Sequence, residues 1–404
     1  MLKRITGYDY SPDLEEVEVI ERKGIGHPDS VADIIAESFS NDYSKYYQKK
    51  YGKILNHWFD KVLISGGEAI LRPGFGSIIK KPKVYLFGKI TRVSNDDLNI
   101  EEFFKITVFR VMRDIFGIED EIMPDIVVDT NSGVGAEHPI SFYNTNVYDI
   151  TKESDDLVSN DTIFCNGYYP YTKLEHYVCD LENYINSKSF KENHYYTGFD
   201  VKVLAKRIKN NIDITVCIPF IAARTESWAL YFELKKNIEN DLYFFTKKFK
   251  WDSVNIHLNT KDREGKGFLT LYGSAFDKGD FGVVGRGNRY LGFITSCRGE
   301  TQEAYSGKNP VIHSGKLFSI IAHRIARKIS ILDGGPVKVI ICINNGSPIK
   351  EPESVFVFTK DKKISDQHIR GLLLNEFNNI HNITTHIINL NPVEEFVTKS
   401  ILLS

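Results

Sequence analysis

Five side chains with a fixed positive charge lie between residues 285 and 316, and glycines flank four of them. Only two acids, Glu300 and Glu303, lie in the same stretch. Glycine lets a backbone turn its N–H groups toward a ligand, while Arg and Lys both bind phosphate oxygens. A lone Gly-Lys pair is typical of a solvated loop, but five such features together predict a polyphosphate-binding site. The five cations are Arg286, Arg289, Arg298, Lys308 and Lys316.

A second candidate is the motif Gly-His-Pro-Asp at 26–29, which precedes apolar residues at helical spacing. The start of a helix attracts anions through its free N–H groups and its dipole. His27 can donate to an oxygen that gains charge, and Asp29 can hold Mg²⁺. Alternatively, Asp29 or Ser30 only caps the helix and His27 is an ordinary surface imidazole. The residues of this motif leave both interpretations open.

Two further motifs have a functional and a plainer interpretation. Asp200 and Lys202 lie two apart in a predicted strand, so they share one face and can form either part of a site or a simple ion pair. Gly133 and Gly135 follow a predicted strand as Gly-x-Gly, which is either a nucleotide loop or, more commonly, a turn.

Acidic residues form the last candidates. Asp280 and Asp277 lie in a glycine-flanked turn, where either can bind a ligand or serve the turn itself. Asp60 precedes a predicted strand, and Glu68 follows a Gly-Gly pair after it. Asp60 and Glu68 form a second acidic cluster or are solvated charges beside a strand.

The composition limits the class of protein. The chain has 404 residues, 42% apolar and 26% charged, which predicts an ordinary globular protein with a large core. A net charge of −2 argues against general nucleic-acid binding, which needs a basic domain. Five cysteines without a C-x-x-C motif argue against a disulfide framework and favour the cytoplasm. No apolar run is long enough for a membrane span, and no signal-peptide pattern follows the N-terminus.

Predicted helices and strands alternate along the chain. Strand pairs followed by helices, in three successive blocks, predict an α+β fold with helices over one face of each sheet. The predicted domains are 1–140, 141–265 and 266–404, with approximate boundaries and with strands free to exchange between them. Helices are predicted from about residue 30 to 43 and over 101–116, 172–186, 226–249, 315–330 and 366–379. Strands are predicted over 61–65, 83–90, 125–129, 200–208, 212–221, 254–258, 268–273, 337–344 and 354–359, with a loop over 72–77.

Together these motifs resemble those of the S-adenosylmethionine synthetases (methionine adenosyltransferases), and most closely the archaeal-type branch. The matching blocks occur in family order and span most of the chain, so the resemblance is specific. They are Glu-Arg-Lys-Gly-Ile-Gly-His-Pro-Asp (21–29), Ala-Asp-Ile-Ile-Ala-Glu (32–37), Asp-Lys-Val-Leu (60–63), Gly-Gly (66–67), Asn-Asp-Thr (160–162), Gly-Tyr-Tyr-Pro (167–170), Gly-Phe-Asp-Val-Lys-Val (198–203), Gly-Asp (279–280), Gly-Arg-Gly-Asn-Arg (285–289), Gly-Lys-Asn-Pro (307–310), His-Ser-Gly-Lys (313–316) and Gly-Ser-Pro-Ile-Lys-Glu-Pro (346–352).

The resemblance implies three pseudo-symmetric α+β domains and a homodimer or higher homo-oligomer with active sites between subunits. It implies that methionine sulfur attacks C5′ of ATP and expels tripolyphosphate, which is then cleaved to diphosphate and phosphate. The implied cofactors are Mg²⁺ and, as a further candidate, K⁺. The implied catalytic residues are His27, Lys202, Arg286 and Lys308, and the implied ATP- or polyphosphate-binding residues are Asp200, Gly133, Gly135, Arg289 and Lys316. The implied substrate-binding residues are Asp280, Glu68 and Asp60, and the implied metal ligands are Asp29 and Asp280.

The chain also departs from the archaeal-type pattern. Phe281 replaces a second acid, Ile312 replaces an Asn, and the stretches 133–138, 161–167 and 172–175 lack residues of the pattern. These changes concern the substrate more than the type of chemistry. The alternatives are a divergent paralogue that acts on another thioether or nucleotide, a weakly active nucleotide-binding regulatory subunit, or an enzyme that only hydrolyses polyphosphate.

Overall fold

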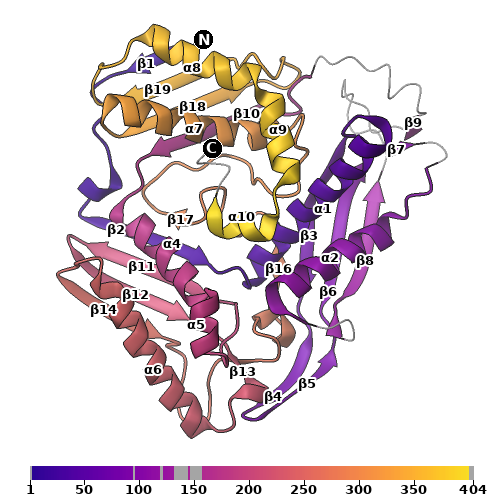
Figure 1. Cartoon of the computed structure of the whole chain (residues 1–404), viewed down its shortest axis with the longest axis vertical. Coiled ribbons are helices and arrows are strands. Elements are labelled where there is room, and N and C mark those ends of the chain that lie inside the picture. The colour runs from indigo at the N-terminus through magenta and orange to yellow at the C-terminus, as the bar shows by residue number, and fades with distance from the viewer. Residues whose placement is uncertain (1, 94–95, 119–121, 132–143, 146–156, 400–404) are drawn as a thin grey trace.

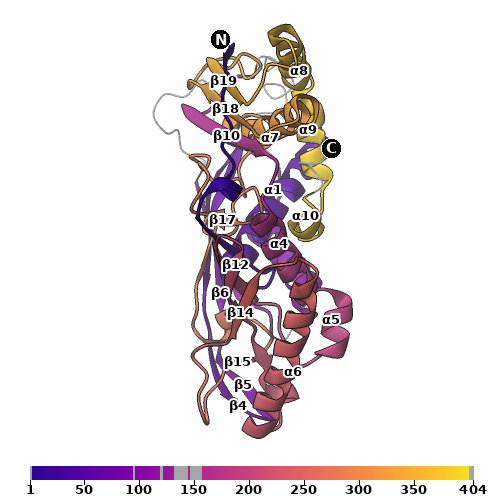
Figure 2. The same ribbon diagram turned by 90° about the vertical axis from the view of Figure 1, so that its left-hand side faces the viewer.

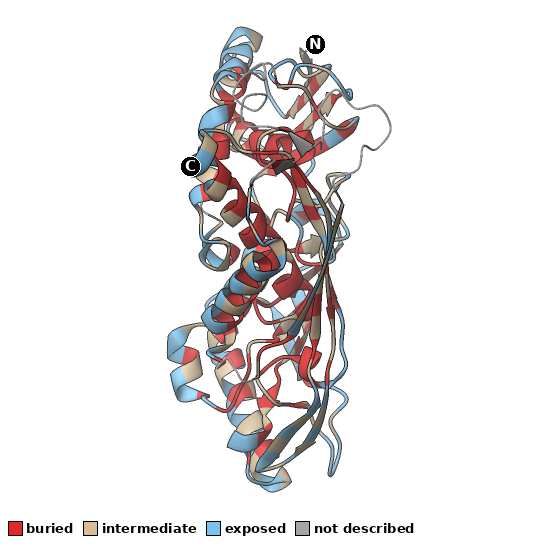
Figure 3. Cartoon of the chain, turned by 90° about the vertical axis from the view of Figure 1, so that its right-hand side faces the viewer, coloured by how far each residue is buried: buried red, intermediate tan, exposed pale blue. Residues whose placement is uncertain are grey.

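The computed structural model describes residues 2–93, 96–118, 122–131, 144–145 and 157–399. The described chain forms three mixed β-sheets, each covered on one face by helices (Figures 1, 2 and 3). This arrangement confirms the predicted α+β class. Within the described ranges, no helix combines the length and the apolar character needed to cross a bilayer.

We name the sheets after one central strand each. The β3 sheet has the order β16 (Gly282–Val283), β3 (His57–Ser65), β6 (Lys83–Ile90) and β8 (Asp125–Asn131). The β11 sheet has the order β14 (Ser253–Leu258), β12 (Asn211–Cys217), β11 (Lys202–Ile208), β2 (Val17–Lys23) and β17 (Ile294–Thr295). The β18 sheet has the order β1 (Leu2–Ile5), β19 (Ser354–Thr359), β18 (Val337–Ile343) and β10 (Ile163–Tyr169).

The same strand pattern occurs in all three sheets. A central antiparallel pair, β3–β6, β11–β12 or β18–β19, is flanked by a parallel strand beside its second member. An antiparallel strand lies beside its first member. The three units are therefore related by a pseudo-symmetry of topology, although the sequence contains no repeat in its letters.

The flanking antiparallel strand always comes from another part of the chain. β2 precedes helix α1 (Pro28–Tyr51), which covers the β3 sheet, but β2 pairs with β11. β10 precedes α4 (Lys173–Ile185) of the β11 sheet, but it pairs with β18. β16 precedes α7 (Ser314–Asp333) of the β18 sheet, but it pairs with β3. Each unit thus gives one strand to the sheet of the next unit, in a closed cycle. No cut of the chain into three continuous segments therefore reproduces the three sheets.

Each sheet packs its covered face into its own apolar core. In β18, for example, Val337, Val339, Ile341 and Ile343 are buried because alternate residues of a strand face the same side. Truncation of one of them, such as Ile341→Ala, should cost about 2–5 kcal/mol. The other covering helices are α2 (Ile100–Phe116) on the β3 sheet, α5 (Lys188–Asn193) and α6 (Trp228–Lys247) on the β11 sheet side, and α8 (Asp366–Asn378) and α9 (Ile380–Asn389) against α7.

Helix ends follow local chemistry. Asn99 caps α2 by accepting from the N–H of Glu102, and Gly117 ends it in a left-handed conformation. The predicted loop over 72–77 is instead the tip of a hairpin between β4 (Glu68–Arg72) and β5 (Phe75–Lys80). The C-terminal helix α10 (Pro392–Thr398) packs against α1 and α2. Short strand pairs are β13 (Phe220–Ile221) with β15 (Leu269–Thr270) and β7 (Arg92–Val93) with β9 (Asn144–Thr145).

Candidate active site

The start of α1 joins two sheets through His27 and Asp29. His27 caps the helix, because its Nδ1 accepts a hydrogen bond of 3.2 Å from the backbone N–H of Asp29. The carboxylate of Asp29 accepts hydrogen bonds of 2.9 Å from Lys23 Nζ and 2.9 Å from the N–H of Val283. The cap predicted at Asp29 or Ser30 is therefore wrong, since the Asp29 carboxylate is bound to groups outside the helix.

These contacts determine the state of the His27 ring. Burial lowers the pKa of His27 to about 4, with Asp29 opposing the shift and Lys23 and Lys202 adding to it. The imidazole is therefore neutral at pH 7. Because Nδ1 accepts the hydrogen bond from Asp29, the remaining ring proton belongs on Nε2. His27 thus presents an uncharged N–H donor at a helix N-terminus.

Lys202 lies beside this helix start. It is the first residue of β11 and pairs in register with Lys23 at the end of β2, so two cations lie side by side. The Lys202 ammonium group forms an ion pair of 3.0 Å with Glu21 and keeps 39% of its side chain exposed. Lys202 therefore pairs with Glu21, and the alternative ion pair with Asp200 is wrong.

Asp200 is buried next to the same region. Its carboxylate accepts a hydrogen bond of 2.8 Å from the N–H of Ala275. Burial raises the pKa of Asp200 to about 7; the Ala275 N–H opposes this shift, and the charges of Asp280 and Asp277 add to it. Asp277 accepts from two backbone N–H groups, of Leu271 and Tyr272, which agrees with the turn interpretation for this residue.

Asp280 is exposed at the edge of the β3 sheet. Its charge opposes the lowered pKa of His27 and adds to the raised pKa of Asp200. Gly282, two residues further along the chain, lies against the start of α1, where a Cβ on it would come within 2.1 Å of the Pro28 carbonyl oxygen. The backbone of Asp280 lies against Gly66, where a Cβ would come within 2.4 Å of the Asp280 carbonyl oxygen. Glu68 follows in β4 and is exposed.

A second group of predicted residues lies around Lys308. Its ammonium group is 2.9 Å from Asp60 and 2.7 Å from Glu303. Burial works against the charged form, but Asp60 and Glu303 outweigh it and raise the pKa of Lys308. Lys308 is therefore charged, and it faces a partly exposed carboxylate in Glu303.

Lys316 is fully buried at the start of α7. Its ammonium group lies 2.6 Å from Glu37 of α1 and donates to the backbone oxygen of Lys308 at 2.9 Å. Burial lowers the pKa of Lys316, and Glu37 opposes this shift. Its contacts join α7 to α1 and to the neighbourhood of Lys308.

The three arginines have different environments. Arg286 is exposed, and its backbone oxygen accepts from Lys23 Nζ. Arg289 forms an ion pair of 3.3 Å with Glu300. Arg298 is bound to the buried carboxylate of Glu175, with contacts of 2.5 and 2.8 Å. Of the three, Arg286 is the most available to a ligand.

The structure thus brings His27, Asp29, Lys202, Asp200 and Asp280 together at one end of α1. It places Lys308, Asp60 and Lys316 around Glu37, two helical turns or about 12 Å further along α1. The segment that carries Arg286 and Arg289 runs between the two groups. Gly133 and Gly135 lie outside the described residues.

Comparison with known proteins gives one family. The model of the S-adenosylmethionine synthetase (AdoMet synthetase) family matches residues 7–391. The chain belongs to this family. S-adenosylmethionine synthases of Saccharolobus islandicus are 35% identical over 380 residues, which cover 90% of this chain and 93% of theirs. That of Thermoplasma volcanium is 34% identical over 388 residues, which cover 93% of this chain and 94% of its own. These identities to archaeal enzymes indicate that the chain is a divergent member of the archaeal type.

A solved structure shares the fold of this S-adenosylmethionine synthetase family member. An S-adenosylmethionine synthetase from Campylobacter jejuni superposes with a TM-score of 0.58 at 14% sequence identity. The match covers 96% of this chain and 99% of the other. At that identity the likeness supports the architecture of three sheets and carries no residue roles.

Few side chains in the described part of this synthetase are placed to hold a metal ion. Among the residues that the structure describes, no group of three or more His, Cys, Asp or Glu side chains is placed to hold a metal ion. Mg²⁺ is commonly bound by only one or two carboxylates together with substrate phosphates. Asp29 and the exposed Asp280 fit that arrangement, because Asp29 lies at the start of α1 and Asp280 is two residues before Gly282, which packs against Pro28 of the same helix start.

Sequence reasoning assigned no role to Lys23, Asp33 or Glu37 of this synthetase. Lys23 binds Asp29, and Glu37 binds Lys316. Asp33 accepts a hydrogen bond of 2.8 Å from the N–H of Gly285. The available signal was the spacing of Asp29, Asp33 and Glu37, since residues four apart lie on one face of a helix.

Proposed function

We propose that this chain is a methionine adenosyltransferase that forms S-adenosylmethionine from ATP and L-methionine by way of enzyme-bound tripolyphosphate. Family membership supports the product, and the arrangement at the start of α1 supports the mechanism. The observation that carries the proposal is the cap made by His27, whose Nδ1 accepts from the Asp29 N–H and so leaves Nε2 as a donor, beside the paired Lys23 and Lys202.

In the first step, the sulfur lone pair of methionine forms a bond to C5′ of ATP. The bond from C5′ to the triphosphate oxygen breaks, and tripolyphosphate leaves with the electron pair. A thioether sulfur carries no proton, so no general base is needed. His27 donates the Nε2 hydrogen bond to the departing oxygen, where negative charge develops. Lys202, Arg286 and Lys308, with Arg289 as a weaker candidate, provide fixed positive charge for the product. Lys316 is fully buried on Glu37 and would act only through its hydrogen bond to the Lys308 backbone.

In the second step, water attacks tripolyphosphate and breaks one P–O–P bond to give diphosphate and phosphate. Mg²⁺, held by Asp29 and Asp280 together with phosphate oxygens, would supply charge compensation when bound. Asp280, Glu68 and Asp60 are the carboxylates that we assign to methionine, and Asp200 with Gly133 and Gly135 to the nucleotide. K⁺ is a further candidate cofactor.

We also propose a homodimer or higher homo-oligomer in the cytoplasm. A shared site between subunits would bring further groups to the exposed residues Arg286 and Asp280. Size measurement of the purified protein in solution tests this proposal. A monomer with full activity would contradict it.

The deciding experiment is incubation of the purified chain with ATP, L-methionine, Mg²⁺ and K⁺, followed by mass analysis. We expect S-adenosylmethionine, diphosphate and phosphate in equal amounts. Phosphate release without a sulfonium product would instead indicate polyphosphate or ATP hydrolysis, and ATP binding without any product would indicate a regulatory subunit.

One observation favours a second candidate, a transferase for another thioether. Phe281, next to Asp280, exposes 57% of its surface at the edge of the proposed site. An exposed aromatic ring there can contact the substrate side chain. A panel of methionine analogues, compared by kcat/KM, separates the two candidates, since methionine should be the preferred substrate under the first proposal.

A further inference from the structure

One face of α1 carries a series of acids at intervals of four residues. We call Asp29, Asp33 and Glu37 the carboxylate ladder. Each member accepts a hydrogen bond from a backbone N–H group of the segment 283–307. The three bonds are Val283 N to Asp29 at 2.9 Å, Gly285 N to Asp33 at 2.8 Å and Gly307 N to Glu37 at 3.0 Å.

Asp33 and Glu37, the second and third members of the ladder, bind backbone groups next to two cations of the proposed site. Asp33 binds the residue directly before Arg286, and Glu37 binds the residue directly before Lys308. Both cations are assigned to polyphosphate in the proposed function. The backbone that presents each cation is therefore fixed to the same rigid helix.

Glycines make this close approach possible. A Cβ on Gly287 would lie 2.0 Å from a carboxylate oxygen of Asp33. A Cβ on Gly307 would lie 2.5 Å from the backbone oxygen of Phe59, and Gly307 has a φ of +75°. The segment thus reaches the ladder only because its backbone carries no side chain at these points.

The three carboxyl groups of the ladder differ in their cationic partners. Lys23 binds Asp29, and Lys316 binds Glu37. Asp33 lies near Lys399 of the C-terminal segment, but burial outweighs the hydrogen bond from Gly285 and the charge of Lys399, and raises the pKa of Asp33 to about 7. Asp33 thus acts through its acceptor oxygens more than through a full charge.

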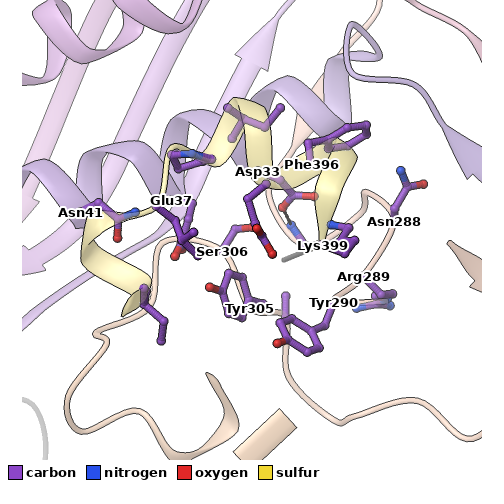
Figure 4. A pocket seen from close by; sticks show the side chains of 17 residues that line it. Asp33, Glu37, Asn41, Asn288, Arg289, Tyr290, Tyr305, Ser306, Phe396 and Lys399 are labelled. Carbon is purple, nitrogen blue, oxygen red and sulfur yellow. Dashed lines mark hydrogen bonds between the residues drawn. The ribbon is translucent and has the colours of Figure 1, made fainter. Parts of the chain in front are cut away.

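A cavity lies directly beside Asp33 and Glu37 (Figure 4). It has a volume of about 90 Å³ and is bordered by α1, the segment 285–306 and the C-terminal helices. Figure 4 shows the rings of Tyr290 and Tyr305 near these two carboxylates, across from α1. Packing is incomplete on this side, so the segment has space to move if its hydrogen bonds are removed.

We propose that Asp33 and Glu37 are positioning residues, which fix the backbone beside Arg286 and Lys308 so that both cations meet the polyphosphate in one geometry. This inference rests on the proposed function for its catalytic consequence. The fixation itself is a property of the chain without substrate, and it can be measured separately.

The test compares Asp33→Ala, Glu37→Ala and Asp33→Asn with the wild-type chain. Hydrogen exchange measured by mass spectrometry, without substrate, reports the amide groups of Gly285 and Gly307. We expect at least tenfold faster exchange at Gly285 in D33A and at Gly307 in E37A, because a buried hydrogen bond from that N–H to a carboxyl oxygen is lost. D33N retains an acceptor oxygen, so it should recover most of the protection.

The catalytic readout is a separate measurement. D33A should lower kcat/KM for ATP about tenfold or more, and D33N should recover most of it. If D33N is as impaired as D33A in both assays, the negative charge is the essential property and the proposal is overturned. If no variant, nor the wild type, forms S-adenosylmethionine, the proposed function fails while the exchange data still decide the positioning role.

Asp42→Ala is the matched control. Asp42 lies on α1 and binds Thr107 at 2.7 Å and Arg110 at 2.8 Å, away from the segment 283–307. It should lower the thermal unfolding temperature without changing exchange at Gly285 or Gly307. Wild-type exchange at both glycines in D33A and E37A, or equal acceleration in D42A, overturns the proposal.

Discussion

The carboxylate of Glu303 lies 2.7 Å from the ammonium group of Lys308. It therefore occupies the side of Lys308 that we assign to a phosphate group, and a bound polyphosphate must compete with it. Glu303→Gln removes this competing charge and should tighten tripolyphosphate binding roughly two- to fivefold, the range of a partly exposed ion pair. Calorimetric titration with tripolyphosphate measures the change.

The control for this prediction is Glu264→Gln, an exposed acid away from the site. It should leave the affinity unchanged. Weaker binding by E303Q would mean that Glu303 holds Lys308 in its productive position.

Two substitutions of His27 separate its capping role from its catalytic role. Asn is a good N-cap, so His27→Asn should keep the acceptor for the Asp29 N–H while it loses the donor on Nε2. We expect the unfolding temperature of H27N to stay near that of wild type and its kcat to fall about 10²- to 10³-fold. His27→Ala should lose the same activity and also about 1 kcal/mol of stability. Wild-type turnover by H27N would refute the proposed donor.

Lys308→Ala should lower turnover by about a hundredfold or more, because a charge aimed at the developing anion is removed. Lys61→Ala is the matched control, since Lys61 also contacts Asp60 but exposes 66% of its side chain. K61A should keep nearly full activity. Steady-state rates of both variants, with circular dichroism to confirm folding, test the assignment. Equal activities would remove Lys308 from the site.

Buried His323 predicts a loss of stability in acid. Burial lowers its pKa to about 3, with the Ser319 carbonyl opposing the shift and Arg298 adding to it. Below pH 6.5 the unfolded chain takes up a proton that the folded chain does not, so stability falls as the pH falls. From pH 7.5 to 5.0 this amounts to about 2 kcal/mol.

His323→Phe should therefore reduce the difference in unfolding free energy between these two pH values by about 2 kcal/mol, measured by urea denaturation. The exposed His368 is the control position, because a histidine in contact with water can be protonated in both states. An unchanged difference in H323F would contradict the prediction.

Local signals predicted most elements. The helices predicted over 101–116 and 172–186 are α2 and α4, whose capping residues are Gly117 at the end of α2 and Thr172 at the start of α4. Strand pairings between distant parts of the chain could not be predicted from local signals. β16 and β17 have only two residues each, which is too short for any periodicity, and the partners of β2 and β10 lie far away in the sequence. The domain boundaries near 140 and 265 stay a prediction, since the sheets exchange strands across the sequence.

The residues of the candidate site could be predicted because each motif is continuous in the sequence. The arrangement of the motifs relative to one another in the fold could not be predicted. Lys308 and His27 lie in separate groups along α1, and the role of Asp33 depends on Gly285, which comes from the last third of the chain. A buried acid on α1 gives no local signal of which distant residue it binds. The roles assigned to the site residues stay predictions until activity is measured.

The pairing of β1 with β19 has a consequence for synthesis. β1 is translated more than 300 residues before its partner β19, with Leu2 opposite Val355. β1 therefore stays unpaired until translation has passed Thr359, the last residue of β19, and unpaired strand edges favour wrong associations. Ribosome-bound chains that lack a complete β19 therefore carry an unpaired β1, and the completion of β19 protects this strand from aggregation.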